Sequence, residues 1–101
     1  MDKYQVIITS KAQSDVAECI GFVKRVSKEA AYKLADELYS SFCSLELFPE
    51  KNPVFPIPNA FPYVLRKQVV NNRYIALYTV EGQKVVVYRV LDVRRSFEQL
   101  L

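Results

Sequence analysis

Three consecutive runs of β-forming residues occupy 63–91, and they restrict the fold more than any other feature of the sequence. The runs are YVLRKQVV (63–70), RYIALYTV (73–80) and KVVVYRVL (84–91). Asn71-Asn72 separates the first two, and asparagine tolerates the positive φ of a tight hairpin turn. Glu81-Gly82-Gln83 separates the second pair, so the sequence predicts an antiparallel meander. The last run is apolar on both faces apart from Arg89, which predicts a central position in the sheet.

The N-terminal half shows helical periodicity after one short β-rich segment, Tyr4 to Thr9, which we expect to be a strand. Ser10 is a candidate helix N-cap, with Gln13 completing a capping box. Apolar residues then recur at spacings of three and four, at Val16, Cys19, Ile20, Val23 and Val26. A second helix follows the candidate N-cap Ser27, and its apolar stripe consists of Ala31, Leu34, Ala35, Leu38, Phe42 and Leu45. So short a link between two helices predicts a helical hairpin.

All five prolines lie between residues 49 and 62. Proline lacks a backbone donor and fixes φ, so no regular element is expected there. We predict a long, stiff loop that is partly polyproline-like. It is either a plain surface connection or the rim of a binding face, because long loops in compact domains often carry function.

The composition fits one globular domain, residues 1–101, with 50% hydrophobic and 25% charged residues. No apolar run approaches the ~20 residues that span a membrane, and the start MDKYQVIITS resembles neither a secretion signal nor a lipidation motif. We therefore expect a cytoplasmic protein, with Cys19 and Cys43 as reduced thiols. The chain has no histidine, which removes Ser/His and Cys/His catalysis and most zinc sites. We expect neither a metal nor a cofactor.

The formal net charge is only +3, but basic residues are concentrated in the C-terminal half. Residues 63–95 contain the acids Glu81 and Asp92 against the bases Arg66, Lys67, Arg73, Lys84, Arg89, Arg94 and Arg95. Tyrosines are interleaved with them, a combination that suits an anionic partner such as nucleic acid or an acidic peptide. A solvated sheet face that happens to be basic explains the composition equally well.

The predicted order of elements is strand, helix, helix and three strands (β-α-α-β-β-β). The first strand must add to one edge of the meander, and the helical hairpin covers one face. This gives a two-layer α+β domain. The other face must then be half polar, and the arginines are expected there or at the strand ends.

This order, with YQVIITSKAQSDV near the start and RYIALYTVEGQKVVVYRVLDVRR near the end, resembles the RelE/ParE superfamily. The resemblance covers nearly the whole chain. It implies the toxin of a bacterial type II toxin–antitoxin pair, neutralised by an antitoxin protein. RelE-like members cut mRNA in the ribosome, whereas ParE-like members inhibit DNA gyrase and have no nuclease chemistry. The fold does not choose between these activities.

The first hypothesis is a RelE-like, ribosome-dependent and metal-independent mRNA endoribonuclease that inhibits translation. Such an enzyme must activate a ribose 2′-OH, neutralise the phosphate and protonate the leaving oxygen. By resemblance, the candidate catalytic residues are Arg66, Lys67 and Arg95. The candidate RNA- or partner-binding residues are Arg73, Arg89, Arg94, Tyr74 and Phe97. From the residues alone, Arg89 fits a buried carboxylate partner as well as a phosphate, and Tyr74 fits core packing.

The second hypothesis is a ParE-like gyrase inhibitor, and departures from the nuclease pattern favour it. Ile75 stands where the family often has an arginine after the tyrosine, and Asp92 stands where many relatives have a histidine. The tail offers Phe97 where some nucleases have a tyrosine. A third hypothesis is an inactive member that only binds its antitoxin. The basic C-terminal half keeps the nuclease marginally ahead.

The expected partners follow from these hypotheses. They are a cognate antitoxin and either the ribosome with mRNA or DNA gyrase, and no membrane. A homodimer and a toxin–antitoxin hetero-oligomer are both compatible with the sequence.

Overall fold

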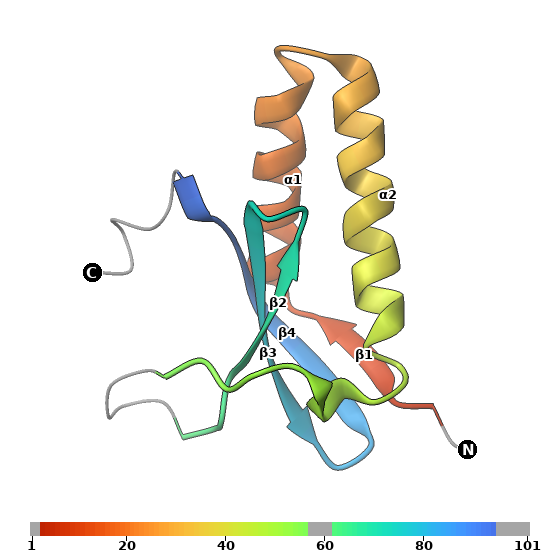
Figure 1. The fold of residues 1–101 in the computed structure, drawn as a ribbon, viewed down its shortest axis with the longest axis vertical. Helices are drawn as coiled ribbons and strands as arrows, with labels where there is room; N and C mark the ends of the chain where they lie inside the picture. Colours follow the sequence, from red (N-terminus) through yellow and green to blue (C-terminus); the bar gives the residue numbers. More distant parts are fainter. Residues whose placement is uncertain (1–2, 57–61, 95–101) are drawn as a thin grey trace.

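The computed structural model describes residues 3–56 and 62–94, which form a helical hairpin packed on a four-stranded sheet (Figure 1). In chain order the elements are β1 (Gln5–Ile8), α1 (Ser10–Lys24), α2 (Lys28–Ser44), the 3₁₀ helix η1 (Pro49–Lys51), β2 (Arg66–Val70), β3 (Tyr74–Glu81) and β4 (Lys84–Asp92). The strand order is β1-β4-β3-β2, with β1 parallel to β4 and the other neighbours antiparallel. The predicted α+β fold, the meander and the central last strand are confirmed. Within the described ranges, no helix is long and apolar enough to cross a membrane.

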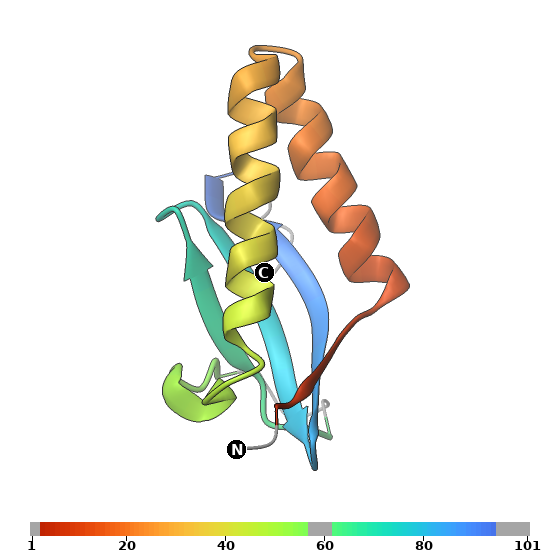
Figure 2. The same ribbon diagram turned by 90° about the vertical axis from the view of Figure 1, so that its right-hand side faces the viewer.

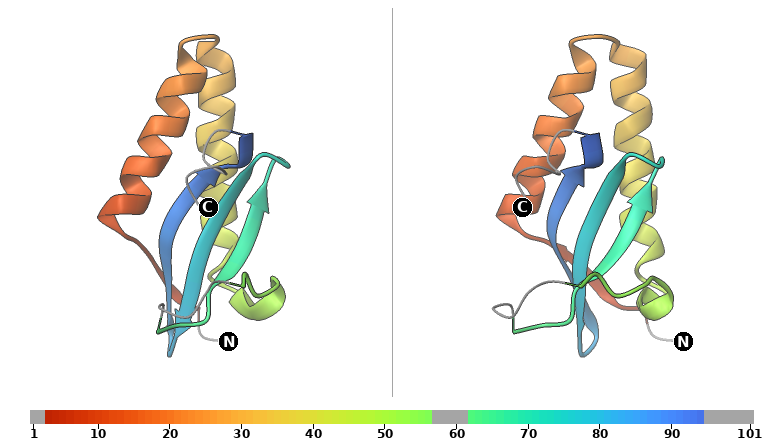
Figure 3. Two further views of the ribbon diagram at one scale, coloured as in Figure 1. Left: turned by 90° about the vertical axis from the view of Figure 1, so that its left-hand side faces the viewer. Right: turned by 60° about the vertical axis from the view of Figure 1, so that its left-hand side comes forward.

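Both helices cover the same face of the sheet, which Figure 2 shows from the helix side and Figure 3 from the sheet side. The core between the two layers contains Ala12, Cys19, Leu34, Leu38, Leu45, Val70, Tyr74, Ala76, Tyr78, Val85, Val87 and Val90. Side chains alternate along a strand, so the residues between these core positions point the other way. We call that second side, which faces away from α1 and α2, the open face; its residues include Lys67, Val69, Ile75, Leu77, Thr79 and Leu91. The name refers to the side of the sheet and not to exposure, because Leu77, Thr79 and Leu91 are buried.

A β-bulge in β4 decides which side Arg89 occupies. Tyr78 pairs with Val87, but the preceding residue Leu77 pairs with Arg89, so Tyr88 is an extra residue in the strand. Without it, strict alternation from the core residue Val87 would turn Arg89 towards the helices. The bulge instead places Arg89 opposite Leu77 on the open face.

The start of α1 differs from the prediction. Thr9, not Ser10, is the N-cap, because its Oγ1 accepts a hydrogen bond from the Ala12 N–H at 3.1 Å. Ser10 is already the first helical residue, and the predicted capping box with Gln13 is wrong. The predicted cap of α2, Ser27, is confirmed by its side chain, which accepts from the third helical N–H at 3.1 Å.

The strand that opens the meander is shorter than predicted, and the proline-rich segment is more ordered. β2 begins at Arg66 rather than at residue 63. Before it, the Phe55 N–H donates to the Leu65 carbonyl at 2.7 Å, and the Lys67 N–H donates to the Pro53 carbonyl at 3.1 Å. The expectation of no regular element was therefore wrong for the first part of the segment, which contains η1 and an isolated β-bridge to β2.

Backbone conformations with positive φ mark the turns. Asn71 and Asn72 have φ of 54° and 53°, which confirms the predicted tight hairpin between β2 and β3. Gly82, in the turn between β3 and β4, has φ of 62°. Phe48 also lies in the left-handed region, with φ of 53°, directly before η1. Such a conformation is costly for a residue with a bulky side chain.

Candidate functional site

Lys67 and Arg89 flank Leu77 on the open face. Leu77 of β3 pairs with Lys67 of β2 on one side and with Arg89 of β4 on the other. Neighbouring strands lie about 4.8 Å apart, so the backbones of the two basic residues are separated by roughly 10 Å. Leu77 between them is only 4% exposed. The pairing with Leu77 thus brings Lys67, a predicted catalytic residue, and Arg89, a predicted binding residue, to the same side of the sheet.

Arg89 forms an ion pair with Asp15 of α1. Its Nε lies 2.7 Å from Asp15 Oδ2, and its Nη2 lies 3.3 Å from Asp15 Oδ1. Asp15 Oδ2 also accepts from the Val90 N–H at 3.0 Å, and Asp15 is 7% exposed. β1 ends at Ile8, before the end of β4, so the carboxylate occupies the edge that β1 leaves uncovered. The sequence left two interpretations of Arg89, an ion pair with a buried carboxylate and a contact to phosphate. The structure shows the ion pair.

Arg66 lies on the helix side of the sheet, opposite the side of Lys67. Its Nη1 donates to the carbonyls of Asn52 at 2.8 Å and Glu50 at 3.3 Å. Its Nη2 lies 3.9 Å from the Glu50 carboxylate. Arg66 therefore fixes the segment around η1, and the neighbouring strand positions Arg66 and Lys67 point to different sides.

A polar network continues from this segment into the space between α2 and the sheet. Asn52 Nδ2 donates to Gln68 Oε1 at 2.6 Å and to Tyr78 Oη at 3.0 Å. Gln68 Nε2 in turn donates to the Ser41 carbonyl at 2.9 Å and to Ser44 Oγ at 3.0 Å. The network satisfies buried polar groups and joins three separate parts of the chain.

Arg73, Tyr74, Asp92 and Arg94 meet where β3 begins and β4 ends. Arg73 Nη2 lies 3.1 Å from Asp92 Oδ2, and Asp92 is 2% exposed. The Arg73 guanidinium carbon is 5.3 Å from the centre of the Tyr74 ring. Asp92 Oδ1 also accepts from the Arg94 N–H at 3.0 Å. Tyr74 is buried, which agrees with core packing, the second interpretation that the sequence allowed for it. Arg94 is exposed.

The tyrosines offer little acid–base chemistry at neutral pH. Burial raises the pKa of Tyr74, Tyr78 and Tyr88 above the ordinary value of 10.0. Their phenols therefore stay protonated at pH 7 and cannot act as general bases there. Tyr88 also donates to the Glu81 carboxylate at 3.3 Å, which further favours its neutral form.

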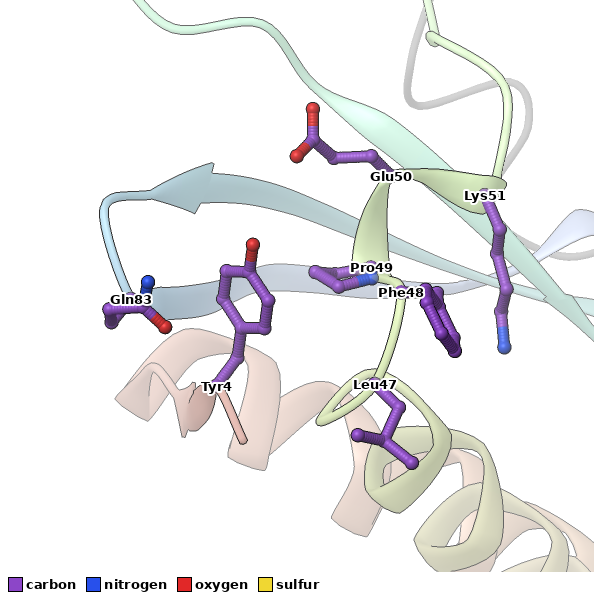
Figure 4. Close-up of a pocket in the computed structure, with 7 residues that line it drawn as sticks. All are labelled: Tyr4, Leu47, Phe48, Pro49, Glu50, Lys51 and Gln83. Atoms are coloured by element: carbon purple, nitrogen blue, oxygen red, sulfur yellow. The ribbon is translucent and has the colours of Figure 1, made fainter. Parts of the chain in front are cut away.

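A surface pocket of about 690 Å³ lies at the other end of the sheet (Figure 4). It is lined by Tyr4, Leu47, Phe48, Pro49, Glu50, Lys51 and Gln83. In the close-up, the rings of Tyr4 and Phe48 lie on either side of Pro49. Phe48 is 64% exposed and has the positive φ described above. Residues in such strained conformations often lie at functional sites, and no local pattern predicted this one.

Those predicted site residues that the structure describes do not converge into one cluster. Lys67 and Arg89 share the open face, Arg66 lies on the helix side, and Arg73 and Arg94 lie at the end of β4. Arg95 and Phe97 lie outside the described residues.

Sequence reasoning missed Asp15, Asn52 and Gln68, which hold these side chains and segments in place. Asp15 had a detectable signal. It falls between Ala12 and Cys19 at spacings of three and four, so it lies on the buried stripe of α1. A lone acid on such a stripe needs a cation or an N–H partner.

Comparison with known proteins agrees with the fold. A family model described as the ParE toxin of the type II toxin–antitoxin system parDE matches residues 6–97. The molecule is thus a toxin of the type II toxin–antitoxin class. The chain belongs to the ParE toxin family, which confirms the predicted RelE/ParE superfamily. No curated protein matches the sequence.

Two solved structures share the fold at low sequence identity. The chromosomal ParDE toxin–antitoxin system from P. aeruginosa has a TM-score of 0.69 and 17% identity, covering 89% of this chain and 96% of that one. The RelBE2 toxin–antitoxin complex from Mycobacterium tuberculosis has a TM-score of 0.60 and 20% identity, covering 91% and 93%. At these identities the likeness concerns the fold.

Proposed function

We propose that this toxin inhibits DNA gyrase by binding it, without nuclease chemistry. The observation that carries the proposal is that three of the candidate cations, Arg66, Arg73 and Arg89, are paired within the chain. Arg89 is paired with Asp15, Arg73 with Asp92, and Arg66 with carbonyls and Glu50. A cation already neutralised by a carboxylate contributes less to a developing phosphate charge than an unpaired one. The match to the ParE family supports the same activity.

The acid–base inventory also supports binding rather than catalysis. RNA cleavage needs a base for the 2′-OH and an acid for the leaving oxygen. The chain has no histidine, and the buried tyrosines have pKa values raised above 10.0. Asp92, at the position where many nuclease relatives have a histidine, is 2% exposed and bonded to Arg73.

The alternative is a RelE-like mRNA endoribonuclease, and one observation favours it. Lys67 and Arg89 stand on the same open face, about two strand spacings apart. Lys67 forms no ion pair with any described residue. With Arg95, these side chains are the ones that would contact a scissile phosphate.

The partner that neutralises the toxin is a cognate antitoxin protein. The family name and both similar structures refer to toxin–antitoxin systems. We infer that the present chain also binds an antitoxin. An acidic segment of the antitoxin would complement the charge of the basic C-terminal half of this chain.

The deciding experiment measures both activities on one preparation of the full chain. Purified gyrase with relaxed plasmid and ATP reports supercoiling on an agarose gel. A cell-free bacterial translation reaction, read by primer extension, reports new mRNA ends. Blocked supercoiling with intact mRNA supports the proposal, whereas unaffected supercoiling at large molar excess of toxin overturns it.

A matched pair of variants tests the nuclease alternative. Lys67→Ala removes the open-face cation that is unpaired among the described residues, and Lys84→Ala removes an exposed cation at the start of β4. If the chain is a nuclease, mRNA ends appear only with ribosomes and Lys67→Ala loses them, while Lys84→Ala keeps them. The gyrase proposal expects no such ends with any of the three proteins.

A further inference from the structure

The outer edge of β2 is an uncovered sheet edge. β2 is the last strand in the order β1-β4-β3-β2. Each residue of β2 has a partner in β3, and in an antiparallel ladder every second residue directs its backbone N–H and carbonyl away from the partner strand. Lys67 and Val69 are the residues that point outwards, since the Lys67 N–H donates to the Pro53 carbonyl on the outer side.

This outer pairing stops after Lys67. No hydrogen bond from the described residues reaches the Lys67 carbonyl or the N–H and carbonyl of Val69. The Val69 side chain, on the open face, is 52% exposed. Natural proteins normally blunt such an edge with a charge, a bulge or a covering segment. Lys67 supplies one charge on this edge, and from Gln68 to Val70 the described part of the chain continues as a regular, uncharged edge with the β-branched Val69 in its middle.

A groove of about 460 Å³ runs beside this edge, between β2 and α2. Its α2 wall contains Asp36, Glu37 and Ser40, and its sheet wall contains Val69 and Asn71. Neither acid forms an ion pair within the described residues. The Gln68 hydrogen bonds to Ser41 and Ser44 hold the two walls together, so the groove exists before anything binds.

We propose that this edge and groove bind an extended segment of a partner protein that carries lysine or arginine at alternate positions. The segment adds to β2 as a further strand, with its backbone bonded to Val69. Residues that alternate along it point either to α2 or to the open face. The basic ones meet Asp36 and Glu37, and the uncharged ones lie beside Val69.

The same charges disfavour a second copy of the chain as the occupant. Two copies paired edge to edge around Val69 would place the two α2 helices side by side. Asp36 and Glu37 of one copy would then face the same acids of the other. Like charges at such a contact are destabilising, so the groove discriminates between a basic strand and its own copy.

The first test uses the purified full chain and three synthetic peptides. Acetyl-VKVKVKT-amide has the expected alternation, acetyl-VEVEVET-amide reverses its charge, and acetyl-KKKVVVT-amide has the same composition without alternation. We expect the first peptide alone to bind, with hydrogen exchange of the Val69 amide slowed by about tenfold or more, as a newly formed strand bond requires. An unprotected Val69 amide at millimolar concentrations of the first peptide overturns the proposal. Equal binding of acetyl-KKKVVVT-amide, in which the charges do not alternate, overturns it as well.

Two pairs of variants locate the contact. Val69→Pro removes an N–H that β3 does not use, and Val69→Thr keeps it. Asp36→Lys changes the charge within the groove, and Glu29→Lys makes the same change at the start of α2. Loss of peptide binding in Val69→Pro and a weakening of about fivefold or more in Asp36→Lys at low salt, with both controls near wild type, support the proposal. Unchanged binding in Val69→Pro overturns it, as does a dimer in light scattering that Val69→Pro dissociates.

Discussion

Asp15 of α1 accepts hydrogen bonds from both the Arg89 guanidinium, at 2.7 Å, and the Val90 backbone N–H, at 3.0 Å. One carboxylate thereby closes the edge of β4 beyond the end of β1 and holds an arginine on the open face. The two residues are 74 positions apart in the chain. The contact thus joins the first helix to the last strand, and it determines how much charge Arg89 presents to a partner.

Replacing Asp15 should destabilise the fold strongly. Asp15→Ala leaves the Val90 N–H and the guanidinium without their acceptor, and we expect a loss of about 2–4 kcal/mol in the free energy of unfolding. Asp15→Asn retains an acceptor oxygen and should lose less. Urea unfolding followed by circular dichroism measures both. A loss below about 0.5 kcal/mol for the alanine variant, the size typical of an exposed pair, would contradict a structural role.

The positive φ of Phe48 should make glycine a more stable replacement than alanine at this position. A residue with a Cβ pays about 1–2 kcal/mol for the left-handed conformation, and glycine does not. We therefore expect Phe48→Gly to be more stable than Phe48→Ala by about 1 kcal/mol, although glycine normally destabilises relative to alanine. Thermal unfolding of the two variants makes the comparison. If alanine is the more stable replacement, the positive φ does not hold in solution.

Tyr74 should make the fold less stable at alkaline pH. Burial raises its pKa above 10.0 in the folded chain, so its contribution is complete below pH 10 and is lost as the pH rises through the folded value. The unfolding free energy of the wild type should fall more steeply above pH 10 than that of Tyr74→Phe, which cannot ionise there. Urea unfolding at pH 8 and pH 11 gives the two slopes. Parallel slopes would show that Tyr74 ionises as easily in the folded chain as in the unfolded one.

Gln68 should matter more than its place on an edge strand suggests. Its side chain accepts from Asn52 and donates to Ser41 and Ser44, so Gln68→Ala leaves several polar groups unsatisfied. We expect a loss of about 2 kcal/mol or more. Val69→Ala, at the adjacent exposed position, serves as the control and should lose less than about 1 kcal/mol. Equal losses would argue against the network.

Local patterns were sufficient to predict the architecture. The spacing of Ala31, Leu34 and Leu38 and the cap at Ser27 depend on residues within a few positions of one another, and so does the Asn71-Asn72 turn. Their outcome is fixed by backbone sterics and by burial of one helix face. The same reasoning failed at the start of α1, because Ser10 ranks above Thr9 as a cap by residue type, yet Thr9 is the cap. Thr9 also donates to the Tyr88 carbonyl, a contact that no local pattern contains.

The candidate site depended on contacts between distant segments. Lys67 and Arg66 are neighbours in the chain, yet the strand turns them to opposite sides and only Arg66 meets Asn52. The bulge at Tyr88 moves Arg89 to the open face, and nothing in VVVYRVL marks it.

The sequence by itself therefore determined the α+β order, the turns, the basic C-terminal half and the family. Only the tertiary structure decided which of those basic residues are neutralised by carboxylates and which edge of the sheet stays uncovered. The physical reason is that periodicity and turn chemistry act over a few residues, whereas ion pairing and edge exposure depend on which distant segments the folded chain brings within hydrogen-bond distance.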